Sequence, residues 1–248
     1  IDLHLVRQWL KEAGKIALIQ RDFLDATLKT DGTLVTNIDR QIETLLVERI
    51  SRYYPDHQIL AEEGSNKKTK GEFLWAIDPI DGTRAYVSGL PIWGISVGIL
   101  RRGDPYAGVF FMPATGEAYW GTDDKAFLND RPLLFRKNAD IRDTSAFIAV
   151  PSNAHCYYTI SFPRLRSLGS TTAHLAYVAC GFAMAALTRR IYIWDVAAVL
   201  PWLEITGVRL VYLSGKTFNP HELLDGHLSP EPLVAAPFNI IEDVRKLI

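Results

Sequence analysis

Two aspartates, Asp78 and Asp81, stand three positions apart in a segment that reads WAIDPIDGT. The residues from Phe73 to Ile77 are apolar and predict a buried strand, and Pro79 is expected to end its pairing. Both carboxylates should then leave the sheet together on one tight turn. Two acids so close repel each other unless a proton or a cation lies between them. The pair therefore predicts a cation site, although an isolated pair of this kind is equally typical of a turn that caps a helix.

Further acidic residues follow other short apolar segments. Predicted strands at 34–36, 59–61 and 191–194 precede Asp39, Glu62 and Asp195. Capping and the helix dipole would explain Asp39 or Asp195 taken singly, but not so many strands that end in an acid. The six His and two Cys show no ligand spacing. An all-oxygen cluster suits a hard cation, Mg²⁺ first, with Mn²⁺ or Ca²⁺ as competitors.

These residues stand in five ordered blocks that resemble the inositol monophosphatase superfamily of Mg²⁺-dependent, Li⁺-sensitive phosphatases. The family's first signature is similar to DPIDGT at 78–83, and its second is similar to WDVAA at 194–198. Supporting blocks are DGTLVTNID at 31–39, AEEGS at 61–65 and RSLGS at 166–170. The resemblance runs from about residue 5 to the C-terminus. Five blocks in order are a stronger signal than a lone DPIDGT.

The resemblance implies a set of metal ligands. Glu62, Asp78 and the Ile80 carbonyl would bind one ion, and Asp78, Asp81 and Asp195 would bind a second. The implied cofactor is Mg²⁺, two or three ions per active site, with Mn²⁺ as a possible substitute and Li⁺ as an inhibitor.

The resemblance also implies catalytic and substrate-binding roles. Asp39 and Thr83 would orient and help to deprotonate the attacking water, with Glu62 as a further catalytic residue. Lys29 is similar to a family lysine near the entrance, at a spacing one residue shorter than expected. Backbone amides at a helix start would hold phosphate oxygens, as exposed N–H groups there also predict. The implied contacts to substrate or phosphate are Gly82, Thr83, Asp81, Ser170 and Asp195.

The expected function is a Mg²⁺-dependent phosphomonoesterase that hydrolyses a small phosphorylated polyol or sugar by in-line attack of metal-activated water. Alternatives in the same superfamily are fructose-1,6-bisphosphatase, histidinol-phosphate phosphatase and 3′(2′),5′-bisphosphate nucleotidase. Inositol-specific members carry an acid seven positions before the second-signature aspartate, where this chain has Thr188, followed by Arg189 and Arg190. A short hydroxyl cannot replace a carboxylate that accepts two hydroxyl protons, which argues against strict inositol specificity.

Two readings from other classes compete. Haloacid-dehalogenase-type phosphatases form an aspartyl phosphate, but they need two Asp separated by one residue, whereas Asp78 and Asp81 are separated by two. A non-catalytic, metal-binding regulatory protein could keep the acidic cluster without turnover. The presence of both Asp39 and Thr83 argues against that reading, because neither is needed as a direct metal ligand.

Composition limits the partners. The chain has 248 residues, 27 basic and 28 acidic, and this balance argues against binding to nucleic acid. The longest apolar run, 175–187, is shorter than the ~20 residues of a membrane span, so no membrane partner is expected. Cys156 and Cys180 are expected to be free, buried thiols, and no secretory signal is visible, so a cytoplasmic location is expected. The family resemblance implies a homodimer that binds a small phosphorylated substrate.

The implied fold is α/β: a layered αβαβα sandwich of the inositol monophosphatase and fructose-1,6-bisphosphatase type. We expect an N-terminal α+β lobe at 1–138 with most metal ligands, and a C-terminal α/β lobe at 139–248 with Asp195 and the substrate side. Pro201 should kink or shorten a helix that begins near Asp195 and continues through Val196. The other expected helices are 2–21, 37 to before Pro55, 170–187 and from Asn239, with a polar loop at 27–31. Antiparallel strands are expected at 92–100, 106–112, 118–121 and 126–128, and later strands at 146–150, near 210 and at 233–236.

Overall fold

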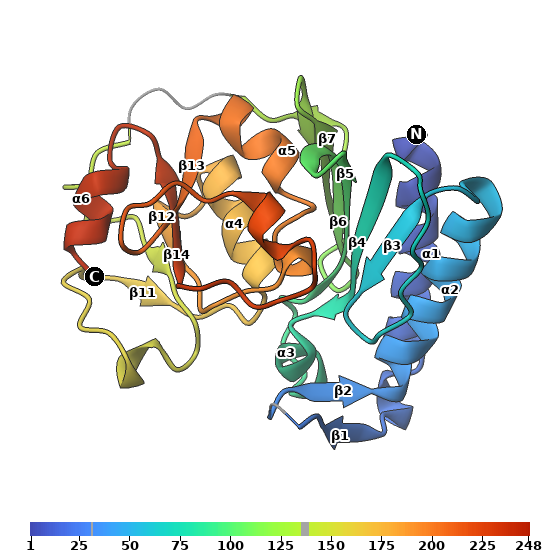
Figure 1. Cartoon of the computed structure of the whole chain (residues 1–248). Coiled ribbons are helices and arrows are strands. Elements are labelled where there is room, and N and C mark those ends of the chain that lie inside the picture. Colours follow the sequence, from blue (N-terminus) through green and yellow to red (C-terminus); the bar gives the residue numbers. More distant parts are fainter. Residues whose placement is uncertain (31, 135–138) are drawn as a thin grey trace.

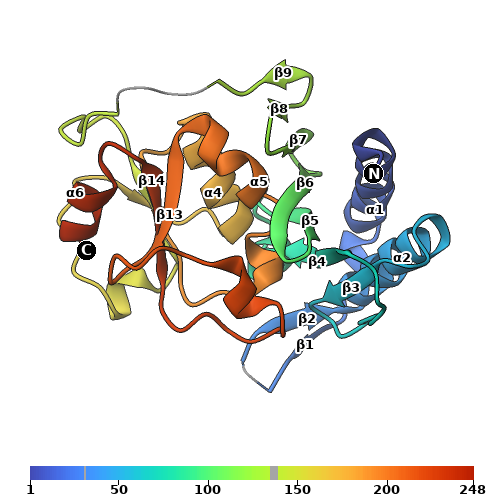
Figure 2. The ribbon, with the colours of Figure 1, turned by 45° about the horizontal axis from the view of Figure 1, so that its top comes forward.

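A computed structural model describes residues 1–30, 32–134 and 139–248 of the chain. Two β-sheets alternate with three sets of helices to give five layers (Figure 1 and Figure 2). Helices α1 (Leu3–Ile19) and α2 (Asn37–Tyr53) cover one face of a seven-stranded sheet. Helices α4 (Thr171–Cys180) and α5 (Leu200–Leu203) pack between this sheet and a five-stranded sheet, which carries α6 (Ile241–Lys246). The predicted αβαβα sandwich is confirmed.

The seven-stranded sheet contains one parallel pair, β3 with β4, and is otherwise antiparallel. The expected run of antiparallel strands after residue 92 is confirmed. In spatial order the strands are β3 (Gln58–Ala61), β4 (Phe73–Asp81), β5 (Gly94–Arg101), β6 (Asp104–Met112), β7 (Glu117–Thr122), β8 (Ala126–Leu128) and β9 (Arg131–Pro132).

The five-stranded sheet is mixed. Its strand β10 is parallel to both of its neighbours, whereas β14 is antiparallel to both of its own. In spatial order the strands are β11 (Leu165–Arg166), β10 (Ile148–Ala149), β12 (Ala185–Leu187), β14 (Leu233–Pro237) and β13 (Val208–Tyr212).

The remaining elements are short. Strands β1 (Ala26–Leu28) and β2 (Leu34–Thr36) form a separate antiparallel hairpin. The expected polar loop at 27–31 is therefore wrong at its start, because residues 27 and 28 pair with β2; residue 31 lies outside the described residues. The helix α3 spans Thr83–Val87, and single 3₁₀ turns lie at η1 (Arg21–Phe23), η2 (Ala154–Cys156), η3 (Ile193–Asp195), η4 (Glu204–Thr206) and η5 (Pro220–Leu223).

The two long N-terminal helices agree with their sequence signals. Asp2 caps α1 by accepting hydrogen bonds from the first-turn amides, and the apolar face of the helix is buried against the sheet. Thr36 and Asp39 form a reciprocal capping box at the start of α2. The helix α2 ends at Tyr53, two residues before Pro55, as predicted.

The predicted helix at 170–187 is wrong in its second half. Helix α4 ends at Cys180, and Gly181 follows with φ 65°, a left-handed conformation that commonly terminates helices. The chain then turns back, and 185–187 form strand β12 at the centre of the five-stranded sheet. An apolar run of this length fits a buried helix or a buried strand. Its second half is a strand because it pairs with neighbouring strands of the sheet.

The predicted strand at 191–194 and the helix from Val196 are also wrong. A 3₁₀ turn, η3, carries Asp195, irregular turns follow, and α5 begins only at Leu200. Pro201 therefore lies in the first turn of a helix, where a missing N–H costs nothing, and it causes no kink.

The expectations for Pro79 and Cys156 differ from the structure, and the one for the lobe boundary stays untested. Strand β4 continues through Pro79 to Asp81, so the proline does not end the strand. Cys156 is exposed, contrary to expectation, whereas Cys180 is buried, and neither forms a disulfide bond. The lobe boundary at residue 138 lies outside the described residues and stays a prediction.

Within the described ranges, no helix has the length and apolar character needed to cross a membrane.

The segment after Asp195 packs unusually closely on the seven-stranded sheet. Gly98 of β5 and Gly108 of β6 are cross-strand neighbours. A Cβ atom on Gly98 would lie 2.2 Å from the Ala197 Cβ, and one on Gly108 would lie 1.9 Å from the Ala198 carbonyl oxygen. Only glycine fits at either position. The distance between the sheet and the segment after Asp195 is therefore set by direct contact with the backbone of β5 and β6.

Candidate active site

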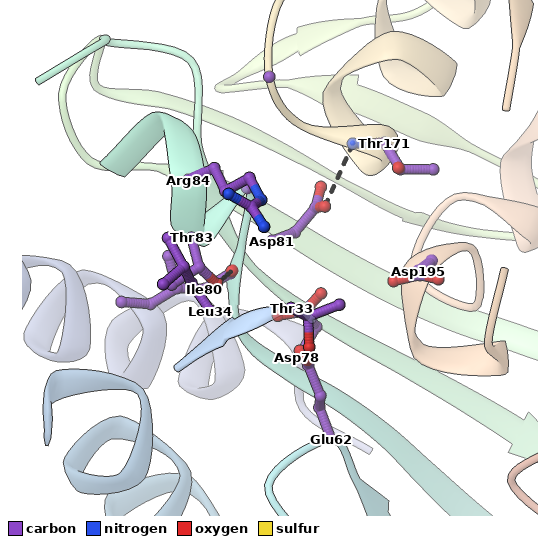
Figure 3. A pocket seen from close by; sticks show the side chains of 12 residues that line it. Thr33, Leu34, Glu62, Asp78, Ile80, Asp81, Thr83, Arg84, Thr171 and Asp195 are labelled. Atoms are coloured by element: carbon purple, nitrogen blue, oxygen red, sulfur yellow. Dashed lines mark hydrogen bonds between the residues drawn. The ribbon is translucent and has the colours of Figure 1, made fainter. Parts of the chain in front are cut away.

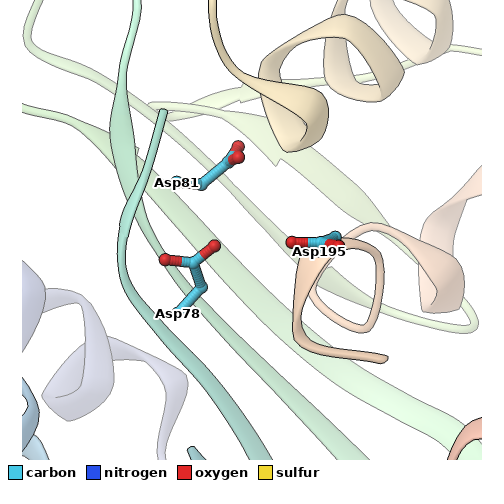
Figure 4. A group of neighbouring side chains, drawn as sticks. All are labelled: Asp78, Asp81 and Asp195. Atoms are coloured by element: carbon cyan, nitrogen blue, oxygen red, sulfur yellow. The ribbon is translucent and has the colours of Figure 1, made fainter. Parts of the chain in front are cut away.

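Three carboxylates meet where the two halves of the fold face each other. Asp78 and Asp81 come from β4, and Asp195 ends η3 on the opposite side (Figure 4). One oxygen of each lies within 4.8 Å of the others. The expected convergence of these acids, separated by 114 positions between Asp81 and Asp195, is present in the structure.

An irregularity in β4 makes this convergence possible. In a regular strand, residues three positions apart point to opposite faces of the sheet. The pairing register between β4 and β5 shifts between Asp78 and Asp81, as at a β-bulge, and both side chains point into the same cleft (Figure 4). Pro79 lies inside this shift and needs no ladder hydrogen bond there.

Burial raises the pKa of all three acids, and repulsion from neighbouring carboxylates adds to this shift for Asp78 and Asp195. Burial is the main cause for Asp78, with further contributions from the charges of Glu62, Asp81 and Asp195. Burial followed by the charge of Asp81 raises the pKa of Asp195. The Asp78 Oδ1 atom is buried and has no hydrogen-bond partner among the described residues. An unpartnered carboxylate oxygen among other oxygen donors fits a hard divalent cation such as Mg²⁺.

Asp81 also binds the N-terminus of α4. Its Oδ2 accepts hydrogen bonds from the Ser170 hydroxyl and from the Thr172 amide at 2.7 Å, and its Oδ1 accepts from the Thr171 amide at 3.1 Å (Figure 3). Burial raises the pKa of Asp81, while these hydrogen bonds act in the opposite direction. The cleft is therefore closed at this point by direct contact between β4 and α4.

Asp39 and Thr83 form a second polar pair behind the cluster. The Thr83 hydroxyl lies 3.2 Å from Asp39 Oδ1 and 3.0 Å from the Ile80 carbonyl oxygen. The backbone amide and the hydroxyl of Thr36 donate to Asp39 Oδ2. Burial raises the pKa of Asp39 to about 6, although the hydrogen bonds from Thr36 oppose the shift. Asp39 is thus held rigidly on α2, with one oxygen directed toward Thr83.

Lys29 connects the β1–β2 hairpin to the loop that follows β3. Its ammonium donates to Glu62 Oε1 at 2.8 Å and to Glu63 Oε1 at 2.6 Å. Burial opposes the charge on Lys29, but the two glutamates outweigh it and raise its pKa. Burial also raises the pKa of Glu63 to about 7. The structure thus places Lys29 at the site despite its shorter spacing.

A cavity of about 250 Å³ opens at the carboxylate cluster (Figure 3), and neither Asp39 nor Lys29 is among its lining residues. Arg84, Gly169 and Thr171 also line it, while Ser170 is buried beside it and reaches it only through Asp81. Thr188 is not among the lining residues; its hydroxyl is bonded to the backbone of Arg189 and Leu233. The predicted site residues that line the cavity are Glu62, Asp78, Ile80, Asp81, Gly82, Thr83 and Asp195.

Sequence reasoning missed several groups that support the site. Thr36 anchors Asp39, and the pattern Thr-x-x-Asp before an apolar helix was its available signal. Thr172 donates its hydroxyl to the Asp195 carbonyl at 2.9 Å, for which the sequence offers no local signal. Glu43 is buried one helical turn after Asp39, on the apolar face of α2, where a carboxylate is unusual.

Comparison with known proteins decides the family. A model described as the inositol monophosphatase family matches residues 4–241. The chain belongs to the inositol monophosphatase family. It is therefore an enzyme of the phosphoric monoester hydrolase class.

Members of this family with different names are similar to the chain at comparable levels. A fructose-1,6-bisphosphatase/inositol-1-monophosphatase from Thermotoga maritima is 30% identical over 245 residues, which covers 95% of each chain. A histidinol-phosphatase from Chlorobaculum parvum is 31% identical over 217 residues, with 83% of each chain covered. A solved Thermotoga maritima IMPase structure superposes with a TM-score of 0.86 at 30% identity, covering 99% of this chain and 95% of the other.

Proposed function

We propose that the chain is a Mg²⁺-dependent phosphomonoesterase that hydrolyses a small phosphorylated polyol or sugar through in-line attack by water. The observation that carries the proposal is the buried, unpartnered Asp78 oxygen within a cluster of three carboxylates that opens into a cavity. Such a cluster is costly unless positive charge enters it. Divalent cations would offset the charge of the carboxylates, and the phosphate of the ester would bind to the cations.

Each acidic ligand has an assigned role in the proposal. Glu62, Asp78 and the Ile80 carbonyl would hold one ion, and Asp78, Asp81 and Asp195 would hold another. When bound, Mg²⁺ lowers the pKa of water and neutralises charge on the phosphate and on the leaving oxygen. A third ion, replacement by Mn²⁺ and inhibition by Li⁺ belong to the same proposal and rest on the family resemblance.

Thr83 and Asp39 would control the proton of the attacking water. If the Thr83 hydroxyl donates to Asp39, its oxygen lone pairs stay free to accept a hydrogen bond from water. The raised pKa of Asp39, about 6, makes this carboxylate a better proton acceptor near neutral pH than an exposed aspartate. The amides of Gly82 and Thr83, beside the carboxylates of the cavity, would orient the phosphate oxygens.

The substrate is proposed only as a class. Relatives named for inositol phosphate, fructose bisphosphate and histidinol phosphate are similarly close to the chain. Thr188 gives the cavity no carboxylate for sugar hydroxyls, which supports a phosphatase that is not restricted to inositol. A bisphosphate nucleotidase remains a further alternative within the proposal.

Phosphate release from an aryl phosphate, with and without Mg²⁺, tests the proposal. We expect turnover only with Mg²⁺, and we expect Asp78→Asn to abolish it, while Glu48→Gln, on the exposed face of α2, should behave as wild type. Turnover by Asp78→Asn at the wild-type rate would refute the two-ion scheme. Mg²⁺ binding without release from any ester of a substrate panel would favour the non-catalytic regulatory reading instead.

We also propose a cytoplasmic homodimer. Neither cysteine forms a disulfide bond, which suits a reducing compartment, and the dimer rests on the family resemblance alone. Light scattering of the purified chain tests the dimer: a mass near 27.9 kDa, that of one chain, would contradict it.

A further inference from the structure

Glu43 is a buried carboxylate that the proposed chemistry does not use. Its exposed fraction is 1%, and it lies on the face of α2 that packs against the site. Among the described residues, it forms no ion pair with a lysine, arginine or histidine. A buried carboxylate without a cation is costly unless hydrogen bonds satisfy both of its oxygens. The partners of Glu43 therefore indicate what it does.

Both oxygens accept hydrogen bonds from the backbone of one loop. Oε2 accepts from the Glu63 amide at 2.7 Å, and Oε1 accepts from the Ser65 amide at 2.9 Å. Gly64, between these two residues, has φ 100°, a conformation that turns successive amides toward a common acceptor. The carboxylate thus closes the turn that directly follows Glu62.

We propose that Glu43 is a positioning residue that holds the loop after β3 so that the Glu62 carboxylate faces Asp78. The Glu62 amide donates to the Ile77 carbonyl at 3.1 Å, which fixes where the loop leaves the sheet. Glu43 fixes the loop on its other side, one residue later. These two anchors fix the backbone on both sides of Glu62, and Lys29 then contacts its carboxylate at 2.8 Å.

The arrangement also links two parts of the site through one rigid element. Asp39 and Glu43 are four residues apart on α2, so their side chains lie on the same face of the helix. Asp39 contacts Thr83, and Glu43 contacts the loop of Glu62. The helix therefore sets the position of the Thr83 pair relative to the Glu62 loop.

The inference rests on the proposed function, and Glu43→Gln tests it separately. Glutamine keeps the shape but directs an NH₂ group toward one of the two amide N–H donors. We expect the Mg²⁺ concentration for half-maximal activity to rise about tenfold, as is typical when a partner of a metal ligand is lost. At saturating Mg²⁺, kcat should stay within about twofold of wild type, because Glu43 touches no reacting atom. The midpoint of the Mg²⁺-dependent rise in Tm should shift by the same factor.

Controls separate the possible outcomes. Glu48→Gln, an exposed change on the same helix, should leave both midpoints unchanged. If wild type shows neither turnover nor a Mg²⁺ effect on Tm, the proposed function fails. If wild type responds and Glu43→Gln has the same midpoints, the Glu43 inference alone is overturned.

A measurement on the unaltered protein decides the case if Glu43→Gln does not fold. Without metal, the amide hydrogens of Glu63 and Ser65 should exchange slowly in wild type, because Glu43 already binds them. The Ser65 side chain lies at an exposed position, so its amide would exchange rapidly if the contact did not exist. Rapid exchange at both positions would overturn the inference.

Discussion

The Asp81 carboxylate caps a helix from the other half of the fold: its Oδ2 lies 2.7 Å from the Thr172 amide nitrogen, 91 positions later in the chain. The same side chain lies in the acidic cluster with Asp78 and Asp195. Asp81 is thus a structural residue as well as a proposed metal ligand, whereas Asp78 has an oxygen with no partner among the described residues. The two acids should therefore respond differently to neutralisation.

Asp81→Asn should destabilise the metal-free protein, whereas Asp78→Asn should not. The side-chain amide introduced by Asp81→Asn cannot accept from all three donors that the carboxylate serves, so the free energy of unfolding should fall by about 1–2 kcal/mol, as for a lost helix cap. Asp78→Asn removes one charge from a repulsive cluster and should leave the free energy equal or higher. Urea unfolding in EDTA at pH 8 measures both. Equal losses in the two variants would show that the α4 contact contributes nothing.

Thr83→Val should separate catalysis from metal binding. Valine keeps the shape of Thr83 but removes the hydroxyl that lies 3.2 Å from Asp39. We expect kcat to fall about a hundredfold or more, within the range for a lost proton-transfer group, while the Mg²⁺-dependent rise in Tm persists. Steady-state kinetics measure the fall in kcat, and thermal melts measure the Mg²⁺-dependent rise in Tm. Thr44→Val, on the exposed face of α2, is the matched control. A kcat within about threefold of wild type would remove Thr83 from the reaction.

His174 should make stability depend on pH in a predictable direction. Burial lowers its pKa to about 4, and its Nε2 accepts a hydrogen bond from the Leu168 amide. Between pH 6.5 and 4, the unfolded chain binds a proton that the native protein does not bind. The contribution of His174 to the free energy of unfolding therefore falls as the pH falls, by about 3 kcal/mol in total.

Urea unfolding of wild type and His174→Gln from pH 7.5 to 4.5 isolates this effect. Glutamine can accept the same hydrogen bond but does not titrate, and the acids of the cluster contribute equally to both proteins. The free energy of wild type minus that of the variant should be constant above pH 7 and should decrease steadily below pH 6.5. A difference that does not change with pH would mean that the ring is not buried as a neutral acceptor.

Gly108→Ala should weaken Mg²⁺ binding although Gly108 does not line the cavity. Its Cβ atom would lie 1.9 Å from the Ala198 carbonyl oxygen, so the segment that carries Asp195 must move. We expect a loss of about 1–3 kcal/mol in the free energy of unfolding, typical of overpacking, together with a higher Mg²⁺ midpoint. Gly116→Ala is the control: its φ of 71° disfavours alanine, but nothing among the described residues lies within 4 Å of the new methyl group. Unchanged Mg²⁺ midpoints in both variants would contradict the role assigned to this close packing.

The sequence was sufficient for features that depend on local chemistry. Helix α2 could be predicted at both ends, because Thr36 and Asp39 signal its start and Pro55 limits its end. The proximity of Asp78 and Asp81 was also predicted, but from a tight turn after the strand, whereas both residues lie within β4 and a register shift brings them together. The αβαβα layering, however, came from resemblance to a family and not from periodicity.

Features that depend on distant contacts could not be predicted. Residues 185–187 are equally suited to a buried helix, and pairing with β10 on one side and β14 on the other makes them a strand. The turn at Asp195 depends on Gly98 and Gly108, about 90 positions earlier, which leave room for its backbone. Glu43 is unusual as an acid on the apolar face of its helix, but the sequence could not predict its partners, because they are backbone amides that any residue type could supply.

The glycine contacts with Ala197 and Ala198 make one side of the cleft harder to displace than the other. The backbone of Gly98 and Gly108 contacts Ala197 and Ala198 directly, so the segment that follows Asp195 has little room to move toward the sheet. The opposite wall is tied by polar contacts of flexible side chains, Lys29 to the glutamates and Arg84 to the Gly32 carbonyl at 2.7 Å. Departure of a cleaved alcohol and its phosphate should accordingly proceed by displacement of the hairpin, while the aspartate opposite stays still.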